Sequence, residues 1–131
     1  MTEKRFLSPD TLAAPFGYSH VVDSPVERIV YISGQVPLDT DGRLVGEGDF
    51  EAQTRQVFEN LTRALEAAGA AWSDVVKLNY FLRDVGEITS VRAIRDGYVD
   101  LEHPPASTLV EVSGLFRQDV LIEIEAVAIR E

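Results

Sequence analysis

Two glutamates lie in the middle of the apolar segment formed by residues 120–129. Strand alternation puts Glu123 and Glu125 on one face of this segment and a purely apolar row on the other. A buried carboxylate is unfavourable unless it is paired, hydrogen-bonded or protonated, and partial burial raises its pKa towards the range useful in general acid–base catalysis. We take Glu123 as the candidate catalytic residue. For Glu125 we prefer the alternative, a structural carboxylate paired with Lys77 or Arg130.

A second set of polar side chains follows a Pro-Pro pair at residues 104–105. Proline cannot continue a helix and drives its predecessor towards extended backbone, so a strand is predicted to start just beyond the pair. Within residues 107–112, alternation places Ser107, Leu109 and Glu111 on one face. We expect this face to point the same way as the two glutamates of the later strand, away from any covering helix.

The remaining segments supply the elements that must position these residues. Asp49 is a suitable N-cap for a helix, and Gly69 a suitable stop. Asp41-Gly42 predicts the tip of a hairpin. Hydrophobic periodicity and β-branched runs predict strands at residues 3–8, 28–33, 73–82, 107–112 and 120–129, and helices at 50–68 and 87–101.

This order of elements predicts an α+β fold. Two helices of this length can cover one face of a mixed five- to six-stranded sheet and no more. The other face is expected to carry apolar side chains, which favours oligomerisation through it. These side chains are Phe81, Leu109, Leu121, Val127 and Ile129.

Length and composition exclude several classes of protein. A chain of 131 residues is expected to form one domain, spanning 1–131. No segment has the apolar length of a membrane span, the N-terminus does not resemble a signal peptide, and there is no cysteine, so we expect a cytoplasmic protein. The net charge of -10 repels nucleic acid.

Metal and cofactor sites are not predicted. The two histidines, His20 and His103, are too far apart in the sequence to indicate a ligand cluster, and the Asp39–Gly42 turn lacks the remaining ligands of a calcium loop. No glycine-rich phosphate loop is present. Any activity is therefore expected to need neither metal nor organic cofactor.

Three motifs carry a family resemblance. They are Pro-Ala-x-x-x-Val-Glu-Val at 105–112, Ile-Glu-Ile-Glu-Ala-x-Ala at 122–128 and Ser-Gly-Gln at 33–35. Together they resemble the reactive intermediate deaminase (Rid, YjgF-like or RidA-like) family over most of the chain. The resemblance implies a chorismate-mutase-like fold, a barrel-like homotrimer with its helices outside, and small-molecule sites between subunits that hydrolyse imines or enamines.

The resemblance also assigns roles to individual positions. It implies that Tyr18 and the Ser33-Gly34 turn line the site and that Glu123 positions the hydrolytic water. Ser107 stands where the imine deaminases of the family carry an arginine that holds the substrate carboxylate. The complete set of substrate-binding candidates is Tyr18, Ser33, Gly34, Phe81, Arg92, Ser107 and Leu109.

A purely structural role is the alternative for three of these residues, Tyr18, Gly34 and Arg92. Tyr18 can be a half-buried aromatic residue, Gly34 can serve a bulge that needs an unusual φ, and Arg92 can be a solvated helix residue.

Three functions remain open at this point. The first is a cofactor-independent hydrolase, or deaminase, acting on an imine, enamine or related C–N bond. It would be a poor 2-imino acid deaminase, because serine cannot replace a bidentate guanidinium. The second is a non-catalytic trimer that binds a small molecule or regulates. The third is a protein-interaction role on an acidic surface.

Overall fold

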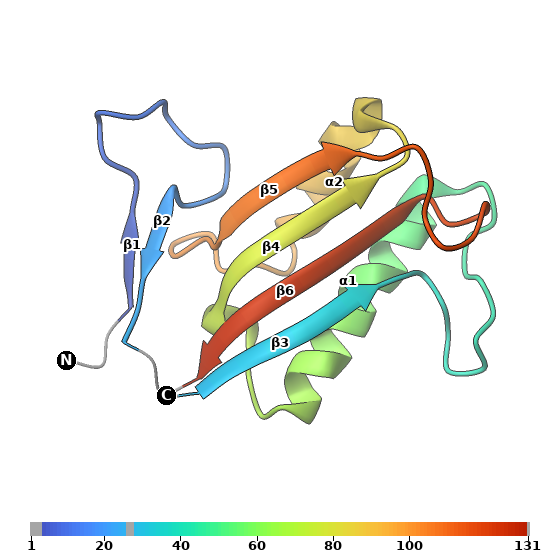
Figure 1. Cartoon of the computed structure of the whole chain (residues 1–131), viewed down its shortest axis with the longest axis horizontal. Coiled ribbons are helices and arrows are strands. Elements are labelled where there is room, and N and C mark those ends of the chain that lie inside the picture. The colour runs from blue at the N-terminus through green and yellow to red at the C-terminus, as the bar shows by residue number, and fades with distance from the viewer. Residues whose placement is uncertain (1–3, 26–27, 131) are drawn as a thin grey trace.

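Two helices cover one face of a four-stranded sheet (Figure 1). The computed structural model describes residues 4–25 and 28–130. The strand order is β3-β6-β4-β5, with only β4 and β5 parallel, so the sheet is mixed and the fold is α+β, as predicted. The strands span Arg28–Gln35 (β3), Val75–Leu82 (β4), Ala106–Glu111 (β5) and Ile122–Arg130 (β6).

A separate two-stranded sheet lies beyond the end of the main sheet (Figure 1). It pairs β1 (Arg5–Leu7) with β2 (Val21–Asp23), and the second of these strands was not predicted. The six strands therefore divide into two sheets and do not form the single sheet expected from the sequence. Each strand of the pair has only three residues, which is too short to give a clear alternation pattern.

The first helix, α1 (Phe50–Ala67), agrees with the prediction. The Asp49 side chain accepts a hydrogen bond from the Ala52 amide at 3.1 Å, and Gly69 follows the helix with φ +69°. This left-handed conformation is one that glycine adopts without steric cost.

The second helix is shorter than predicted. A 3-10 turn, Val85–Glu87, precedes α2 (Ile88–Arg95), and the chain continues from Asp96 in turns. Gly97 lies in these turns, and aspartate and glycine are both weak helix formers.

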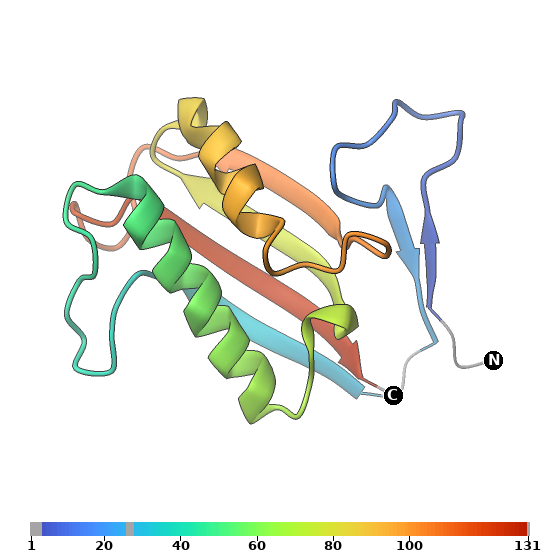
Figure 2. The same ribbon diagram turned by 180° about the vertical axis from the view of Figure 1, so that it is seen from behind.

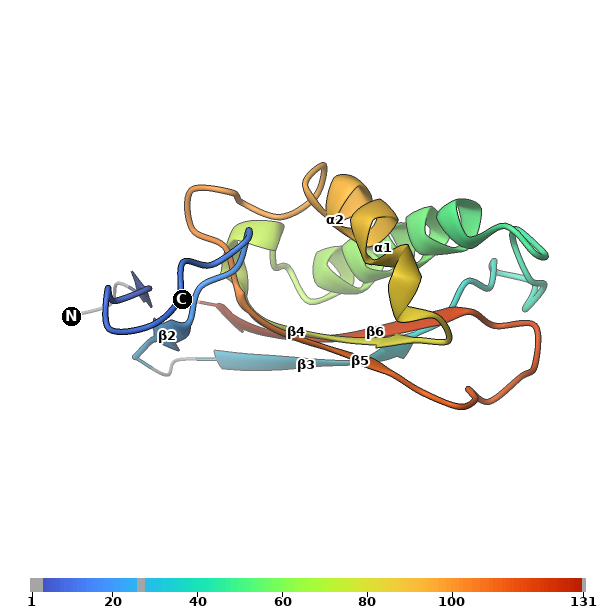
Figure 3. The same cartoon turned by 90° about the horizontal axis from the view of Figure 1, so that it is seen from above.

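Both helices pack on the same face of the sheet, and the opposite face is left open (Figures 2 and 3). The core lies between these two layers. Its largest side chains are Phe58 and Leu61 from α1 and Leu78, Tyr80 and Ile124 from the sheet, each 2% exposed or less.

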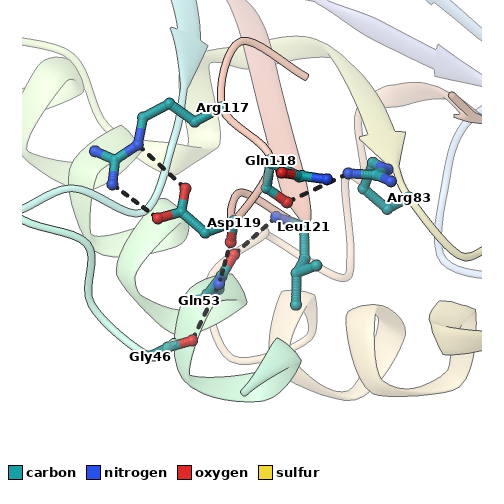
Figure 4. A network of polar contacts seen from close by, with 7 residues as sticks. All are labelled: Gly46, Gln53, Arg83, Arg117, Gln118, Asp119 and Leu121. Carbon is teal, nitrogen blue, oxygen red and sulfur yellow. Dashed lines mark hydrogen bonds and ion pairs between the residues drawn. The ribbon is translucent and has the colours of Figure 1, made fainter. Parts of the chain in front are cut away.

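The buried Gln53 side chain joins α1 to two loops (Figure 4). Its amide nitrogen donates to the carbonyl oxygens of Gly46 (3.0 Å) and Asp119 (2.9 Å), and its oxygen accepts from the Leu121 amide at 2.9 Å. Asn60, two turns further along the same side, donates to the carbonyl oxygens of Val36 and Leu38. These two residues fix the connection between β3 and α1 and the loop that leads into β6.

The register of β4 with β5 corrects one expectation. Ser107 and Leu109 pair with Leu78 and Tyr80, which are buried beneath the helices. Adjacent residues in register share a face, so Ser107, Leu109 and Glu111 point towards the helices and not away from them. Glu123 does point to the open face, because its neighbours Ile122 and Ile124 are fully buried. Alternation defines two faces of an isolated strand, but only its pairing with β4 determines which face meets the helices.

Candidate functional site

A pocket of about 210 Å³ lies between the sheet and α2. The sheet contributes Tyr80, Ser107 and Leu109 to its wall, α2 contributes Arg92 and Arg95, and the loop before β2 contributes Tyr18. Phe16, Ile88 and Val91 complete the lining. We call this the helix-side pocket. Four of the predicted binding residues meet here: Tyr18, Arg92, Ser107 and Leu109.

Ser19 holds the loop that carries Tyr18 in place. Its amide donates to the carbonyl oxygen of Pro105 at 2.9 Å, and its hydroxyl donates to the carbonyl oxygen of Pro104. The Ser19 side chain is buried at this junction. The Pro-Pro segment that starts β5 is thus also the anchor that brings Tyr18 beside Ser107.

Two arginines, three residues apart on α2, reach the helix-side pocket. This spacing places them on the same side of the helix. Arg92 is exposed and its guanidinium lies 5.5 Å from the centre of the Phe16 ring. Arg95 is only 8% exposed, pairs with Asp96 at 2.9 Å, and donates to the carbonyl oxygen of Phe16 at 3.4 Å.

Tyr80 lines this pocket and carries a buried hydroxyl that has no partner among the described residues. Its side chain is 2% exposed, and its hydroxyl makes no hydrogen bond to the part of the chain that the structure describes. Burial raises the pKa of Tyr80, an effect opposed by the nearby Arg95 charge, so the hydroxyl stays protonated at neutral pH. A buried donor without a partner in the protein is uncommon, and it makes the Tyr80 hydroxyl a candidate contact for a ligand.

The second group of predicted residues lies on the open face, around Glu123. Phe81 is its register partner on β4, and Gly34 lies against it from β3. Burial, and then the charge of Glu125, raise the pKa of Glu123 above its ordinary value. We call Gly34, Phe81, Glu123 and Glu125 the open-face cluster.

Gly34 lies in close contact with the Glu123 side chain. The register shift between Ile32 and Gln35 makes a bulge at Ser33-Gly34, and Ser33 is exposed there. The backbone of Gly34 does not have a positive φ, so the bulge alone does not demand glycine. A Cβ on Gly34 would lie 1.9 Å from a carboxylate oxygen of Glu123, which leaves room only for glycine unless the carboxylate moves. The bulge thus places backbone beside the candidate catalytic group.

The eight predicted site residues therefore form two groups on opposite faces of one sheet. Tyr18, Arg92, Ser107 and Leu109 line the helix-side pocket, whereas Ser33, Gly34, Phe81 and Glu123 lie on the open face. Within one chain the sheet itself separates them. Sequence reasoning missed Tyr80 and Arg95. The position of Arg95, one turn after Arg92, was the available signal.

Two other hollows are present, and the larger of them borders Gly34 of the open-face cluster. One, of about 470 Å³, borders Gln35, Asp39, Asn60 and Arg63, and one of about 210 Å³ borders Phe50, Arg83 and Glu87. Within residues 4–25 and 28–130, the acidic and histidine side chains form no cluster placed to hold a metal ion. No helix in these ranges is both long and apolar enough to cross a membrane.

The amino-acid sequence matches a known protein family. The model of the family described as Endoribonuclease L-PSP matches residues 9–130. The 3-aminoacrylate deaminase RutC of Acinetobacter baylyi is 36% identical over 125 residues, which cover 95% of this chain and 97% of that protein. The 2-iminobutanoate/2-iminopropanoate deaminase of Salmonella typhimurium is 41% identical over 105 residues, covering 78% and 80%.

Solved structures agree with the fold. YyfB of Yersinia pestis, a Rid family protein, superposes with a TM-score of 0.86 at 35% identity, over 97% of this chain and 98% of that one. TdcF of E. coli with bound serine superposes with a TM-score of 0.71 at 30% identity, over 90% and 91%. These neighbours have the YjgF/Rid architecture, which is the chorismate-mutase-like fold expected from the sequence motifs.

Proposed function

The chain belongs to the Endoribonuclease L-PSP family, which contains the Rid and YjgF-like proteins. We therefore propose that it is a homotrimeric hydrolase of imines, enamines or related C–N bonds. The proposed protein is a single cytoplasmic domain of residues 1–131. Its reaction uses water and needs no metal or organic cofactor. Two of its relatives are named as deaminases of a small enamine acid and of small imino acids.

One observation carries the proposal that the site lies between subunits. Glu123 and Ser107 point to opposite faces of the same sheet, so one chain cannot bring them to one ligand. The open face also exposes Tyr31, Ile29 and Val110, at 77%, 43% and 41%. An apolar surface of this kind favours association. We propose that a second copy packed on this face brings the mouth of its helix-side pocket to the open-face cluster of the first.

The open-face cluster suits the proton transfers of hydrolysis. Water adds to the carbon of the C=N bond, the nitrogen leaves as ammonia, and a carbonyl group remains. A carboxylate accepts a proton from the attacking water and its acid form returns one to the leaving nitrogen. The raised pKa of Glu123 favours this exchange near neutral pH.

Ser107 limits the substrates of the proposed enzyme. A charge-assisted bidentate contact to a substrate carboxylate contributes about 2–5 kcal/mol, equivalent to roughly thirty- to several-thousand-fold in rate. Serine offers no such contact. We expect slow turnover of 2-aminoacrylate generated in situ, compared with a relative that carries arginine at this position. Comparable turnover would contradict this role of Ser107.

The acidic surface argues against RNA as the substrate, although the family description includes an endoribonuclease. The chain has a formal net charge of -10, and a phosphate backbone is repelled by such a surface. Incubation with single-stranded RNA should leave it uncut under conditions in which an imine is hydrolysed.

The proposed role of Glu123 is tested with Glu123→Gln and a panel of small imines and enamines. Loss of a general acid–base group typically lowers the rate by about 10²–10⁴-fold. The matched control is Glu66→Gln, an exposed residue of α1 with the same change of charge. Unchanged turnover in Glu123→Gln would contradict the role. Ligand binding by the natural protein without turnover would instead favour the non-catalytic binding trimer.

Mixed trimers test whether the site is shared between chains. One variant, Ser107→Trp, fills the helix-side pocket of the chain that carries it. The other variant, Glu123→Gln, removes the catalytic carboxylate from the open-face cluster of the chain that carries it. If each site takes one part from each of two subunits, unfolding and refolding the two inactive variants together in equal amounts should restore about a quarter of the natural activity. A site contained within one chain would give no restoration.

A further inference from the structure

We infer that Tyr80, Arg95 and Arg92 form an anion-recognition wall in the helix-side pocket, and that this wall holds the carboxylate of a small apolar acid. The inference rests on the proposed small-molecule site and assigns the chemical class of its ligand. In this proposal the ligand's carboxylate is bound by Tyr80 on β4 and by the two arginines of α2, and not by the residue at position 107.

The Tyr80 hydroxyl is the first observation. Tyr80 lines the pocket, and its buried hydroxyl has no hydrogen-bond partner among residues 4–25 and 28–130. Burial keeps the Tyr80 hydroxyl protonated, so it acts mainly as a hydrogen-bond donor. A neutral O–H donor makes its strongest hydrogen bond to an anionic oxygen. Phenylalanine would fill the same space in the core without the unpaired oxygen, so packing alone does not account for the hydroxyl.

The two guanidinium groups are the second observation. Arg95 is nearly buried and uses only part of its five N–H donors on Asp96 and the Phe16 carbonyl. Arg92 lies at the exposed end of the same wall, over the Phe16 ring. Asp96 balances the charge of Arg95, whereas Arg92 makes no ion pair within residues 4–25 and 28–130. The positive charge of Arg92 at the mouth of the pocket favours a negatively charged ligand.

The size and lining of the pocket favour a short carboxylic acid over inorganic phosphate. Its volume of about 210 Å³ corresponds to roughly seven water-sized groups at about 30 Å³ each. Ile88, Val91 and Leu109 supply an apolar surface that suits a hydrocarbon chain. A fully hydrated phosphate would gain nothing from these side chains.

The position of the wall also explains how an acid can bind while 2-imino acids react slowly. An anion held by Tyr80 and α2 takes a different place from one held by an arginine at position 107. In a 2-imino acid the C–N bond is directly beside the carboxylate. When the carboxylate is bound at this different place, the C–N bond is displaced from the position that it would take with an arginine at position 107.

Binding of sodium butanoate, measured by isothermal titration calorimetry on the natural oligomer, tests the inference, with butanamide as the neutral isostere. We expect butanoate to bind at least tenfold more tightly than butanamide. Tyr80→Phe should weaken butanoate binding by about ten- to a hundredfold, and Arg92→Gln should weaken it severalfold. The control Arg55→Gln removes an exposed arginine of α1 and should leave binding unchanged.

Thermal unfolding of the free Tyr80→Phe protein separates ligand recognition from a structural role. Removing an unpaired buried hydroxyl should leave the melting temperature unchanged or raise it. A structural role predicts the opposite, a lowered melting temperature with unaltered butanoate affinity, and would overturn the inference.

Three other results would overturn the inference. They are equal binding of butanoate and butanamide, tighter binding of inorganic phosphate than of butanoate, and turnover of a neutral imine by a protein that binds no carboxylate. The last result would leave the proposed hydrolase in place. Conversely, butanoate binding through Tyr80 without any turnover supports the anion wall and contradicts the proposed catalysis.

Discussion

At the scale of single residues, the contact between Gly34 and Glu123 links strand geometry to chemistry. The carboxylate of Glu123 occupies the space that a side chain at position 34 would fill. A glycine in a strand is itself slightly unfavourable. Its presence at this bulge is therefore explained by the position of the carboxylate and not by the stability of the strand.

Gly34→Ala should separate activity from stability. The atoms that obstruct the new Cβ belong to the flexible Glu123 side chain, which can move, so we expect the free energy of unfolding to change by less than about 1 kcal/mol. Turnover of the best imine substrate should fall at least tenfold, because the carboxylate is displaced. The control is Gly114→Ala, where no atom lies within 4 Å of the added methyl group. Equal activity in both variants would contradict the importance of the contact.

The raised pKa of Glu123 also predicts a pH dependence of stability. The folded protein binds this proton more tightly than the unfolded chain, whose ordinary value is 4.5. Folding therefore loses stability as the pH rises from this value through the higher folded pKa. Glu123→Gln removes that penalty. It should be more stable than the natural protein at pH 7.5, and the difference should vanish below about pH 4.

Urea unfolding at both pH values measures this effect. Glu66→Gln, which removes an exposed charge from α1, corrects for the general benefit of reducing a net charge of -10. A difference between Glu123→Gln and the natural protein that is the same at both pH values would show that the carboxyl group titrates normally.

At the scale of elements, α1 acts as a support for loops as well as a cover for the sheet. Gln53 is completely buried and makes three hydrogen bonds to backbone groups before and after α1 in the sequence (Figure 4). Arg83 adds a contact from the end of β4 to the Gln118 carbonyl at 3.4 Å. The start of β6, which carries Glu123, is thus positioned by a residue of α1 distant in sequence.

Gln53→Leu should destabilise the protein by about 2–4 kcal/mol, because it leaves two carbonyl groups and one amide, all partly buried, without partners. The control Gln56→Leu, on the same helix, removes one side-chain bond, to Asn60, and should cost less than about 1 kcal/mol. Urea titrations give both values, and an unchanged m-value confirms that the transitions are comparable. Equal costs would mean that the loops are held by other contacts.

At the scale of the whole molecule, the open face of the sheet is the surface that most needs a partner. Ile29 and Tyr31 on β3 pair in register with Ile129 and Val127 on β6, so the apolar side chains are contiguous. Val110 and Phe81 extend this surface across the sheet. The helices cover only the other face (Figure 3).

We predict that the natural chain forms a homotrimer through this face. Native mass spectrometry at micromolar concentration should show trimers, and Tyr31→Lys should shift the population to monomers by placing a charge in the interface. Leu101→Lys introduces the same charge at an exposed apolar residue beyond α2 and should leave the trimer intact. A stable monomer of the natural chain would contradict both the assembly and any site shared between subunits.

The sequence by itself determined the elements whose signals are local. The cap at Asp49 and the stop at Gly69 predicted α1, and alternation predicted the four strands of the main sheet, because both signals depend on neighbours within a few residues. The motifs around Gly34, Ser107 and Glu123 indicated the family, which the match over residues 9–130 confirms.

Only the tertiary structure decided which side chains face one another. The register of β4 with β5 turned Ser107 and Leu109 towards α2, opposite to the face expected from their strand alone. The helix-side pocket brought in Tyr80 and Arg95, which line it from two different elements, β4 and α2. The physical reason is that alternation fixes the two faces of a strand, but pairing and burial, which depend on the whole sheet, fix what each face meets.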